Sequence, residues 1–220
     1  MSTTKRGLFI TFEGPEGSGK STQLRRLAAR LRSEGLTVLE TAEPGGTAIG
    51  MQIRRILLDA KNHELRPTTE LLLMFAARAQ NVDELILPAL ARGEIVLCDR
   101  FTDSSLVYQG AARGLGAEIV YEIDRIACRG LIPDLTIVVD IATEVGLERA
   151  RARNQNAQDI ETRLDEQAID FHRKVRDAYL QLASDEQNRV TLLDGAGSEE
   201  NVEKDVWSAV SAFRQAESPG

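Results

Sequence analysis

The chain has 220 residues, of which 42% are hydrophobic and 28% are charged, a balance typical of a globular protein that buries a core. Its net charge of −7 argues against broad electrostatic binding to nucleic acid or anionic membranes, and no apolar run approaches the roughly 20 residues that span a bilayer. The only cysteines, Cys98 and Cys128, have no metal-ligand spacing, and no secretory signal is visible, so we expect a reduced, cytoplasmic protein.

Short apolar runs and amphipathic stretches alternate along the chain. We expect strands at residues 8–12, 36–40, 94–98, 134–141 and 189–193. We expect helices at residues 20–32, 49–58, 71–91 with a start signal at 67–70, 104–109, 117–128, 143–153, 161–183 and 199–213. Thr47 is placed to cap the second of these helices, and Pro88 to bend the third, because proline has no backbone N–H. Residues 154–159 are expected to be a polar interruption, and residues 215–220 a disordered tail.

The alternation predicts an α/β fold of a single domain over residues 1–220, with a five-stranded, mainly parallel sheet and helices on both faces. Ligands of such folds bind at the carboxyl ends of the strands. Glu43, Asp99 and Asp140 each follow an expected strand. We therefore expect these carboxylates at the same edge as the glycine-rich segment that follows the first strand.

That glycine-rich segment has the spacing of a phosphate-binding P-loop, with a strand before it and a helix after it. Its glycines let several backbone N–H groups face one anion, and the helix adds its positive N-terminal end. Lys20 is placed to reach the β- and γ-phosphates of ATP, and the Ser21 hydroxyl to ligate Mg²⁺. The residues expected to bind ATP are Gly14, Pro15, Glu16, Gly17, Ser18, Gly19, Lys20 and Ser21.

Two further sites carry charges that need a partner. Asp99 and Arg100 directly follow a buried strand. In isolation, such a pair of charges at a strand end is equally well explained as a structural ion pair. Beside a P-loop, however, such an Asp is typical of the residue that organises Mg²⁺, and the arginine is suited to clamp a second phosphate. Arg78 lies among apolar and small helix residues, so it faces either an acidic residue of the protein or a nucleotide.

Four segments together resemble the motifs of thymidylate kinase, in the right order and spacing. They are residues 12–22 (FEGPEGSGKST), 43–47 (EPGGT), 99–101 (DRF) and 104–110 (SSLVYQG). The resemblance covers nearly the whole chain and implies the P-loop NTPase fold. It also implies transfer of the γ-phosphoryl group of ATP to dTMP with Mg²⁺, giving dTDP and ADP, in a homodimer that would bury apolar surfaces of the helices at 71–90 and 119–126.

The resemblance also assigns roles to the residues around the phosphates. Lys20 would stabilise the transferred charge, and Ser21 and Asp99 would hold Mg²⁺. Arg100 would grip the phosphate of dTMP. Glu16 corresponds to the family's acidic residue that contacts the 3′-hydroxyl of the sugar.

On the side of the base, the resemblance pairs Arg78 with the thymine edge. Ser105 and Gln109 would line the base and sugar pocket, and Tyr108 would crowd a ribose 2′-hydroxyl. Arg54 is a candidate for the monophosphate side, with a solvated helix face as the alternative.

Three positions depart from the family pattern. The family usually stacks a phenylalanine on thymine four residues before the base-pairing arginine, a position held here by Met74, with Phe75 about 100° further around the helix. Either residue is therefore a candidate to cover the base. Ala42 stands where many relatives have an arginine, and Gly17 where some relatives have an arginine in the P-loop.

The missing P-loop arginine has a mechanistic consequence, because phosphoryl transfer needs positive charge near the transferred group. Arginines 149, 151 and 153 precede the polar interruption, which resembles the bacterial subclass that supplies this charge from a mobile lid, here about residues 149–163. Arg153 is the first candidate for the catalytic arginine and Arg149 the second. The alternative is a basic, solvent-facing helix end.

Other functions remain open from the sequence. A P-loop kinase for another nucleotide or deoxynucleoside is one, although Arg78, Tyr108 and Gln109 favour dTMP. A nucleotide-dependent switch or ATPase is the other, although no DNA- or protein-binding module is visible. His63 and His172 are expected on surface helices, and no acid–base pair is expected, because positioning and electrostatics can carry phosphoryl transfer.

Overall fold

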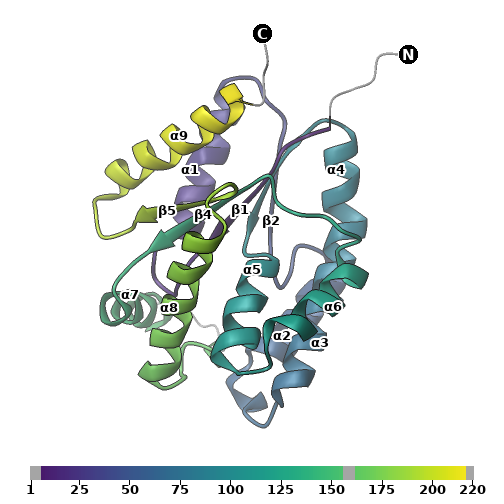
Figure 1. Cartoon of the computed structure of the whole chain (residues 1–220), viewed down its shortest axis with the longest axis vertical. Helices are drawn as coiled ribbons and strands as arrows, with labels where there is room; N and C mark the ends of the chain where they lie inside the picture. Colours follow the sequence, from purple (N-terminus) through teal and green to yellow (C-terminus); the bar gives the residue numbers. More distant parts are fainter. Residues whose placement is uncertain (1–5, 156–161, 217–220) are drawn as a thin grey trace.

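The computed structural model describes residues 6–155 and 162–216. Five strands form its sheet: β1 (Phe9–Glu13), β2 (Val38–Ala42), β3 (Ile95–Asp99), β4 (Leu135–Asp140) and β5 (Val190–Asp194). Their order is β2-β3-β1-β4-β5, and every neighbouring pair is parallel (Figure 1). The α/β fold predicted from the sequence is confirmed. Each parallel connection needs a crossover, and helices supply it.

The helical segments that surround the sheet are α1 (Lys20–Ser33), α2 (Ala48–Leu58), the 3₁₀ turn η1 (Ala60–Asn62), α3 (Pro67–Asn81), the π-helical η2 (Val82–Ile86), α4 (Leu87–Ala91), α5 (Thr102–Ser105), the π-helical η3 (Leu106–Ala112), α6 (Ala117–Ala127), α7 (Thr143–Gln155), α8 (Ile169–Asp185) and α9 (Glu199–Ala216).

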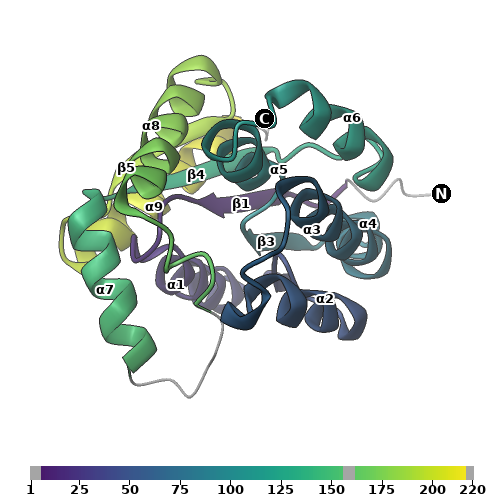
Figure 2. The same ribbon diagram turned by 90° about the horizontal axis from the view of Figure 1, so that it is seen from below.

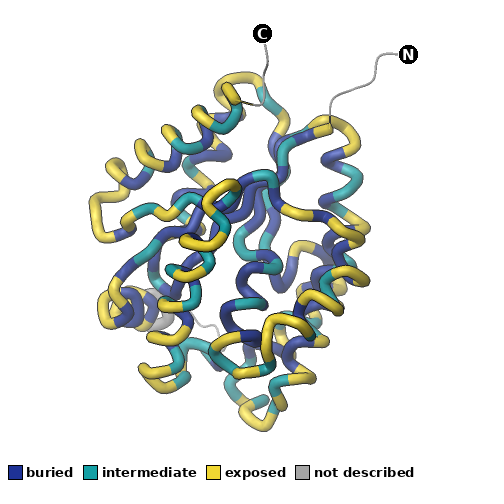
Figure 3. The backbone as a smooth tube through the Cα atoms, viewed as in Figure 1, coloured by how far each residue is buried: buried dark blue, intermediate teal, exposed yellow. Residues whose placement is uncertain are grey.

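The two faces of the sheet are covered by different sets of helices. In β1, Ile10 and Phe12 pack with α1 and α9, whereas Phe9 packs with α3, α4 and α6 on the opposite face. Helix α8 joins this second face through Val138 of β4 (Figure 2). The alternation follows from the two-residue period of a strand, which sends successive side chains to opposite sides. The three central strands β1, β3 and β4 are therefore almost wholly buried, whereas the edge strand β5 is partly exposed (Figure 3).

The long helix expected at 71–91 changes its winding before Pro88. Helix α3 ends at Asn81, and η2 separates it from α4. Because Pro88 has no N–H for the carbonyl of Glu84, the backbone widens into a π-helical turn ahead of it. Thr47 caps α2 as expected, since its hydroxyl accepts from the Gly50 N–H at 2.9 Å.

Two expectations about helices are wrong. Helix α8 begins at Ile169, not at residue 161, because Arg163 bonds to another element: its N–H donates to Leu58 O at 3.2 Å and its Nε to Leu57 O. Residues 215 and 216, expected in the disordered tail, belong to α9. Residues 156–161 of the expected lid and the tail beyond 216 lie outside the described residues. Among the described helices, none is long and apolar enough to cross a membrane.

Candidate active site

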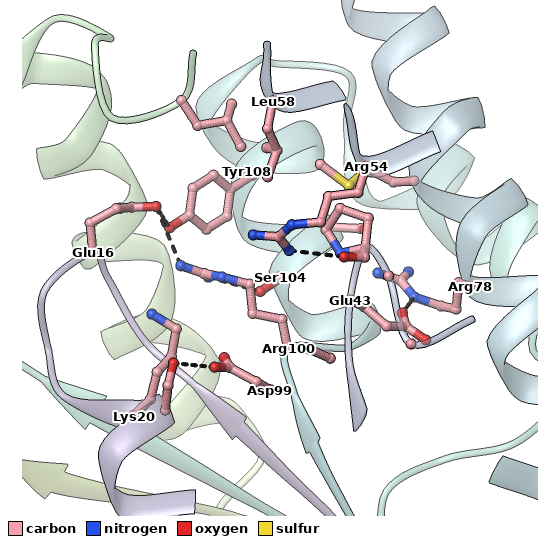
Figure 4. Close-up of a pocket in the computed structure, with 18 of the residues that line it drawn as sticks. Glu16, Lys20, Glu43, Arg54, Leu58, Arg78, Asp99, Arg100, Ser104 and Tyr108 are labelled. Carbon is pink, nitrogen blue, oxygen red and sulfur yellow. Dashed lines mark hydrogen bonds and ion pairs between the residues drawn. The ribbon is translucent and has the colours of Figure 1, made fainter. Parts of the chain in front are cut away.

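A cavity of about 630 Å³ opens at the carboxyl edge of the sheet (Figure 4). Its wall comes from the P-loop after β1, the turn after β2, the segment after β3, and helices α2, α3 and η3. On the P-loop side it is lined by Glu16, Gly17, Gly19, Lys20, Ser21 and Asp99. The expected P-loop residues that do not line the cavity are Gly14, Pro15 and Ser18. The strand-end residues predicted to meet at one edge of the sheet thus border one space, with the exception of Asp140, which pairs with Arg176.

Close packing requires a glycine at position 17 of the P-loop. Gly17 has a φ of +68°, and a Cβ there would lie 2.0 Å from the carbonyl oxygen of Gly146 in α7. Any side chain at this position would displace the backbone of α7, which explains why an arginine is absent from the loop. Gly19, with a φ of +93°, precedes α1, and no side chain caps that helix. Its N-terminal N–H groups are therefore available to an anion.

Lys20 is a buried cation whose present partner is weak. Its Nζ donates to Pro15 O at 3.2 Å, and the residue is 8% exposed. Burial, and then the charge of Arg100, lower the pKa of Lys20 to about 8. An anion in the loop would oppose both effects by stabilising the ammonium. The loop and its lysine thus form a site suited to a polyphosphate.

Ser21 and Asp99 meet at the mouth of this site, as predicted, because the Ser21 hydroxyl donates to Asp99 Oδ2. Hydroxyl and carboxylate oxygens are the hard ligands that Mg²⁺ prefers. Within residues 6–155 and 162–216, no cluster of three His, Cys, Asp or Glu residues could form a metal cage from protein alone. The pair therefore fits a Mg²⁺ ion that takes its other ligands from phosphate and water.

Arg100 enters the cavity from a strained backbone. Its φ of +71° is unusual for a residue with a side chain, and its N–H donates to Phe12 O at 2.9 Å. Nη1 donates to Ser104 Oγ and Tyr179 OH, each at 3.1 Å. The guanidinium also lies over the Tyr108 ring, 4.9 Å from its centroid. These contacts fix the direction of the charge before any ligand arrives.

Glu13 lies beneath Arg100 and is completely buried. Its Oε2 accepts from Ser104 Oγ at 2.5 Å and from Tyr179 OH at 2.8 Å, the same two hydroxyls that accept from Arg100. Its Oε1 accepts from the Phe101 N–H at 2.7 Å. Burial, and then the neighbouring Asp103, raise the pKa of Glu13 to about 7. Sequence reasoning missed this residue, although a carboxylate inside a buried strand was the available signal.

Glu16 is held at the opposite end of the guanidinium. Its Oε1 accepts from Tyr108 OH at 2.6 Å and from Arg100 Nη2 at 3.3 Å, and its Oε2 lies 3.5 Å from Nδ1 of His172 (Figure 4 shows the first two contacts). Burial alone would raise the pKa of Glu16, but His172 and the cations of Arg100 and Lys20 hold it below its ordinary value. The carboxylate therefore stays ionised in the cavity wall.

The position of His172 corrects the expectation of a surface helix. The residue is 2% exposed, because it belongs to the buried face of α8 together with Val175, Tyr179 and Ala183. Those residues recur at intervals of three and four, which is the period of one helix face. This spacing was readable in the sequence. His63, in contrast, is exposed, but it lies in the turn after η1 and not on a helix as expected.

Arg78 satisfies both alternatives left open by the sequence. Its Nε pairs with Glu43 Oε2 and its Nη2 donates to Phe101 O at 3.0 Å, so the protein supplies an acidic partner. Asn81 supports Glu43 by donating to Oε1 at 3.1 Å. Nevertheless Arg78 lines the cavity, and its buried Nη1 finds no hydrogen-bond partner among the described residues. This nitrogen is thus left for a ligand.

The base side of the cavity distinguishes Met74 from Phe75. Met74 lines the cavity, whereas Phe75 faces away into the apolar cluster beneath α3. Phe75 is therefore not placed to contact a ligand in this cavity, since one residue turns the side chain by about 100°. Ser105 and Gln109 line the same region, as expected.

Behind Gln109, a buried carboxylate that sequence reasoning missed anchors this wall. Glu70, 1% exposed, accepts from Gln109 Nε2 at 2.9 Å and from Arg163 Nη1 at 2.8 Å. Nothing local in the sequence pairs residues so far apart. Arg54 also lines the cavity, and its Nη1 donates to Pro44 O at 2.9 Å.

The two lid candidates are not equally visible. Arg149 Nη1 donates to Gly195 O at 3.2 Å, which ties it to the turn after β5. The backbone of Arg153 belongs to α7, but its side chain lies outside the described residues. Arg149 is not among the described residues that line the cavity.

Comparison with known proteins agrees over nearly the full length. The family model described as thymidylate kinase matches residues 12–206. The chain is 51% identical to a thymidylate kinase of Pelobacter propionicus, over 93% of this chain and 94% of that protein, and 48% identical to one of Deinococcus radiodurans, over 94% and 97%. The crystal structure of thymidylate kinase from Ehrlichia chaffeensis superposes with a TM-score of 0.74 at 29% identity, covering 94% of this chain and 99% of that one. The chain therefore belongs to the thymidylate kinase family, the nucleoside monophosphate kinases that phosphorylate dTMP to dTDP with ATP.

Proposed function

We propose that the cavity binds ATP and dTMP together and that the residues described above carry the transfer between them. The observation on which this depends is that two groups of cations border one space. Lys20 and the N-terminus of α1 form the first group, and Arg100 and Arg78 form the second. One phosphate site would need only the first group. Arg100 is close enough to Lys20 to lower its pKa, so the two groups meet within the cavity. Two adjoining groups about a shared cavity suit a donor and an acceptor nucleotide whose phosphates meet.

On the donor side, Gly14–Ser21 cradles the phosphates of ATP through backbone N–H groups, and Lys20 reaches the transferred phosphoryl group. Ser21 and Asp99 hold Mg²⁺, which when bound neutralises developing charge on the phosphate oxygens. The pairing of their oxygens at the mouth of the loop supports this assignment.

On the acceptor side, Arg100 binds the phosphate of dTMP and Glu16 accepts from the 3′-hydroxyl. Arg78 donates from its remaining nitrogen to the thymine edge, and Met74 covers the ring. Burial raises the pKa of the Tyr108 phenol, so Tyr108 stays a donor to Glu16 and fills the space beside the sugar. Ser105, Gln109 and Arg54 complete the walls of the acceptor pocket.

The catalytic arginine comes from a lid of about residues 149–163, with Arg153 as the candidate for contact with the transferred group. The bond from Arg149 to Gly195 O supports a different place for that residue, beside the turn after β5. Arg153→Ala should lower kcat far more than it raises KM for dTMP, because the contact forms mainly in the transition state. Arg151→Ala is the matched control, and a larger kcat loss for Arg149→Ala would reassign the role.

The active molecule is a cytoplasmic homodimer of single-domain subunits that binds neither nucleic acid nor membrane. Large apolar side chains are exposed on three neighbouring helices, including Ile56 on α2, Leu72 on α3 and Ile126 on α6. Such a patch supports a protein interface. Sedimentation should find a dimer that Leu72→Glu dissociates, whereas Leu192→Glu, an exposed position on β5, should leave it intact. A monomeric wild type would refute the assembly.

The reaction is tested with a panel of nucleoside monophosphates and deoxynucleosides, by coupled detection of ADP. We expect dTMP to have the highest kcat/KM and ATP turnover without acceptor to be slow. Preference for another acceptor would overturn the substrate assignment. Rapid ATP hydrolysis without acceptor would instead support an ATPase or switch.

A further inference from the structure

His172 occupies a position where burial of an apolar residue would cost less free energy of desolvation. It lies in the first turn of α8, at the head of a buried face that continues with Val175 and Tyr179. Its side chain is 2% exposed. Burying an imidazole without hydrogen bonds costs free energy, so an unpaired histidine in this packing needs a compensating polar contact.

The nearest charged group to His172 is Glu16, across the space between α8 and the P-loop. Nδ1 of His172 lies 3.5 Å from Glu16 Oε2. In the described part of the chain, neither ring nitrogen of His172 nor Oε2 of Glu16 makes a hydrogen bond. Oε1, in contrast, accepts from Tyr108 and Arg100. The carboxylate is thus held through one oxygen and faced by His172 at the other.

The imidazole ring is fixed by its neighbour. Phe171 meets His172 edge-to-face, with centroids 5.6 Å apart and planes at 88°. The same Phe171 ring meets Tyr108 at 6.1 Å and 61°. Both side chains that flank the Glu16 carboxylate therefore rest on one aromatic ring, which limits their rotation. The geometry suits positioning, because both flanking groups pack against the same ring.

We propose that His172 is a positioning residue for the acceptor sugar. Its Nδ1–H faces Glu16 Oε2 and restricts rotation of the carboxylate, so that Glu16 presents a lone pair to the 3′-hydroxyl. No proton passes to the substrate, because the 3′-hydroxyl is not the reacting group. The inference rests on the proposed function, in which Glu16 contacts that hydroxyl. It predicts that His172 matters only for acceptors that carry the hydroxyl.

The test compares dTMP with its 3′-deoxy analogue, 2′,3′-dideoxythymidine 5′-monophosphate, in steady-state assays of the full chain. His172→Phe keeps a ring and removes both nitrogens, whereas His172→Asn retains an N–H donor near the position of Nδ1. We expect His172→Phe to lower kcat/KM for dTMP about tenfold, the low end of the range for a polar contact to a charged group, because Nδ1 lies 3.5 Å from Glu16 Oε2. For the deoxy analogue we expect a change within about twofold, and His172→Asn should restore most of the activity with dTMP.

A double variant with Glu16→Gln adds an internal check. If His172 acts through Glu16, His172→Phe should have little further effect in that background. Melting temperatures establish folding, and His172→Leu replaces His172→Phe if the latter does not fold.

Equal losses on both substrates would overturn the proposal in favour of a structural role, and unchanged kinetics on both would overturn it outright. If the wild type phosphorylates dTMP but does not discriminate between the two acceptors, the inference falls while the proposed function stands. If the wild type phosphorylates neither, the proposed function fails as well.

Discussion

Replacing Glu13 with glutamine should remove a pH-dependent loss of stability from the folded protein. Glu13 is completely buried, and its pKa rises from an ordinary 4.5 to about 7. Burial is the main cause, and the charge of Asp103 adds to it. Between these two pH values the folded chain binds a proton that the unfolded chain has released. The free energy of unfolding contributed by Glu13 is therefore full below pH 4.5 and is lost as the pH rises through 7.

The size of this loss follows from the shift. One pKa unit corresponds to about 1.4 kcal/mol, so the contribution falls by about 3 kcal/mol between pH 4.5 and pH 7.5. No discount for solvent screening applies, because Glu13 is fully buried. Urea denaturation of the wild type and of Glu13→Gln, at one protein concentration and several pH values, measures it. Groups common to both proteins largely cancel in the difference.

The expected result is that the wild type loses stability relative to Glu13→Gln as the pH rises over this interval. Glu64→Gln, which removes an exposed carboxylate, is the control for loss of one charge. A stability difference between wild type and Glu13→Gln that is flat from pH 4.5 to 7.5 would refute the reasoning. A difference that grows in favour of the wild type would show that the hydrogen bonds to Glu13 outweigh its burial.

Three further predictions concern the cavity wall. Arg78→Ala should lower the free energy of unfolding by about 3–5 kcal/mol, because it leaves Glu43 buried without its cation. Thermal or urea denaturation measures this loss, and Arg78→Ala combined with Glu43→Ala should recover part of it. Gly17→Arg should raise KM for ATP or abolish folding, since its Cβ would meet Gly146 O at 2.0 Å, and activity at the wild-type level would show that α7 yields easily. Removal of divalent cations with EDTA should abolish phosphoryl transfer and excess Mg²⁺ restore it, whereas transfer that survives EDTA would exclude Ser21 and Asp99 as metal ligands.

The parts of the fold and the site that the sequence predicts are those that depend on short-range pattern. The P-loop needs only neighbouring residues, so Gly14–Ser21 could be recognised with its flanking strand and helix. Strand ends were predictable in the same way, because the parallel arrangement alone places Glu43 and Asp99 at one edge. The sequence did not decide between Met74 and Phe75, because neighbouring residues differ by only one step around the helix. The packing of α3 decides which of the two side chains faces the cavity.

The parts that could not be predicted depend on contacts between distant segments. Residues 162–168 have an apolar spacing compatible with a helix. In the structure, however, the Arg163 N–H and Nε donate to the carbonyl oxygens of Leu58 and Leu57. Glu70 of α3 accepts from both Gln109 and Arg163 only because η3 and the segment after residue 161 meet at this helix. Propensity is a weak prior where such tertiary bonds compete with it.

The cations of the site are held in place by internal counterions before a nucleotide arrives. Arg100 lies 3.3 Å from Glu16, and Lys20 Nζ donates to Pro15 O, so each buried charge has a partial partner within the protein. Without these partners, burying two cations together would cost several kcal/mol per ion. An entering phosphate can displace Glu16 from Arg100 without leaving the carboxylate unpartnered, because Glu16 still accepts from Tyr108 and faces His172. Besides the contact with a sugar hydroxyl that we propose for it, Glu16 therefore supplies the internal charge that keeps the cations of this anion site in place.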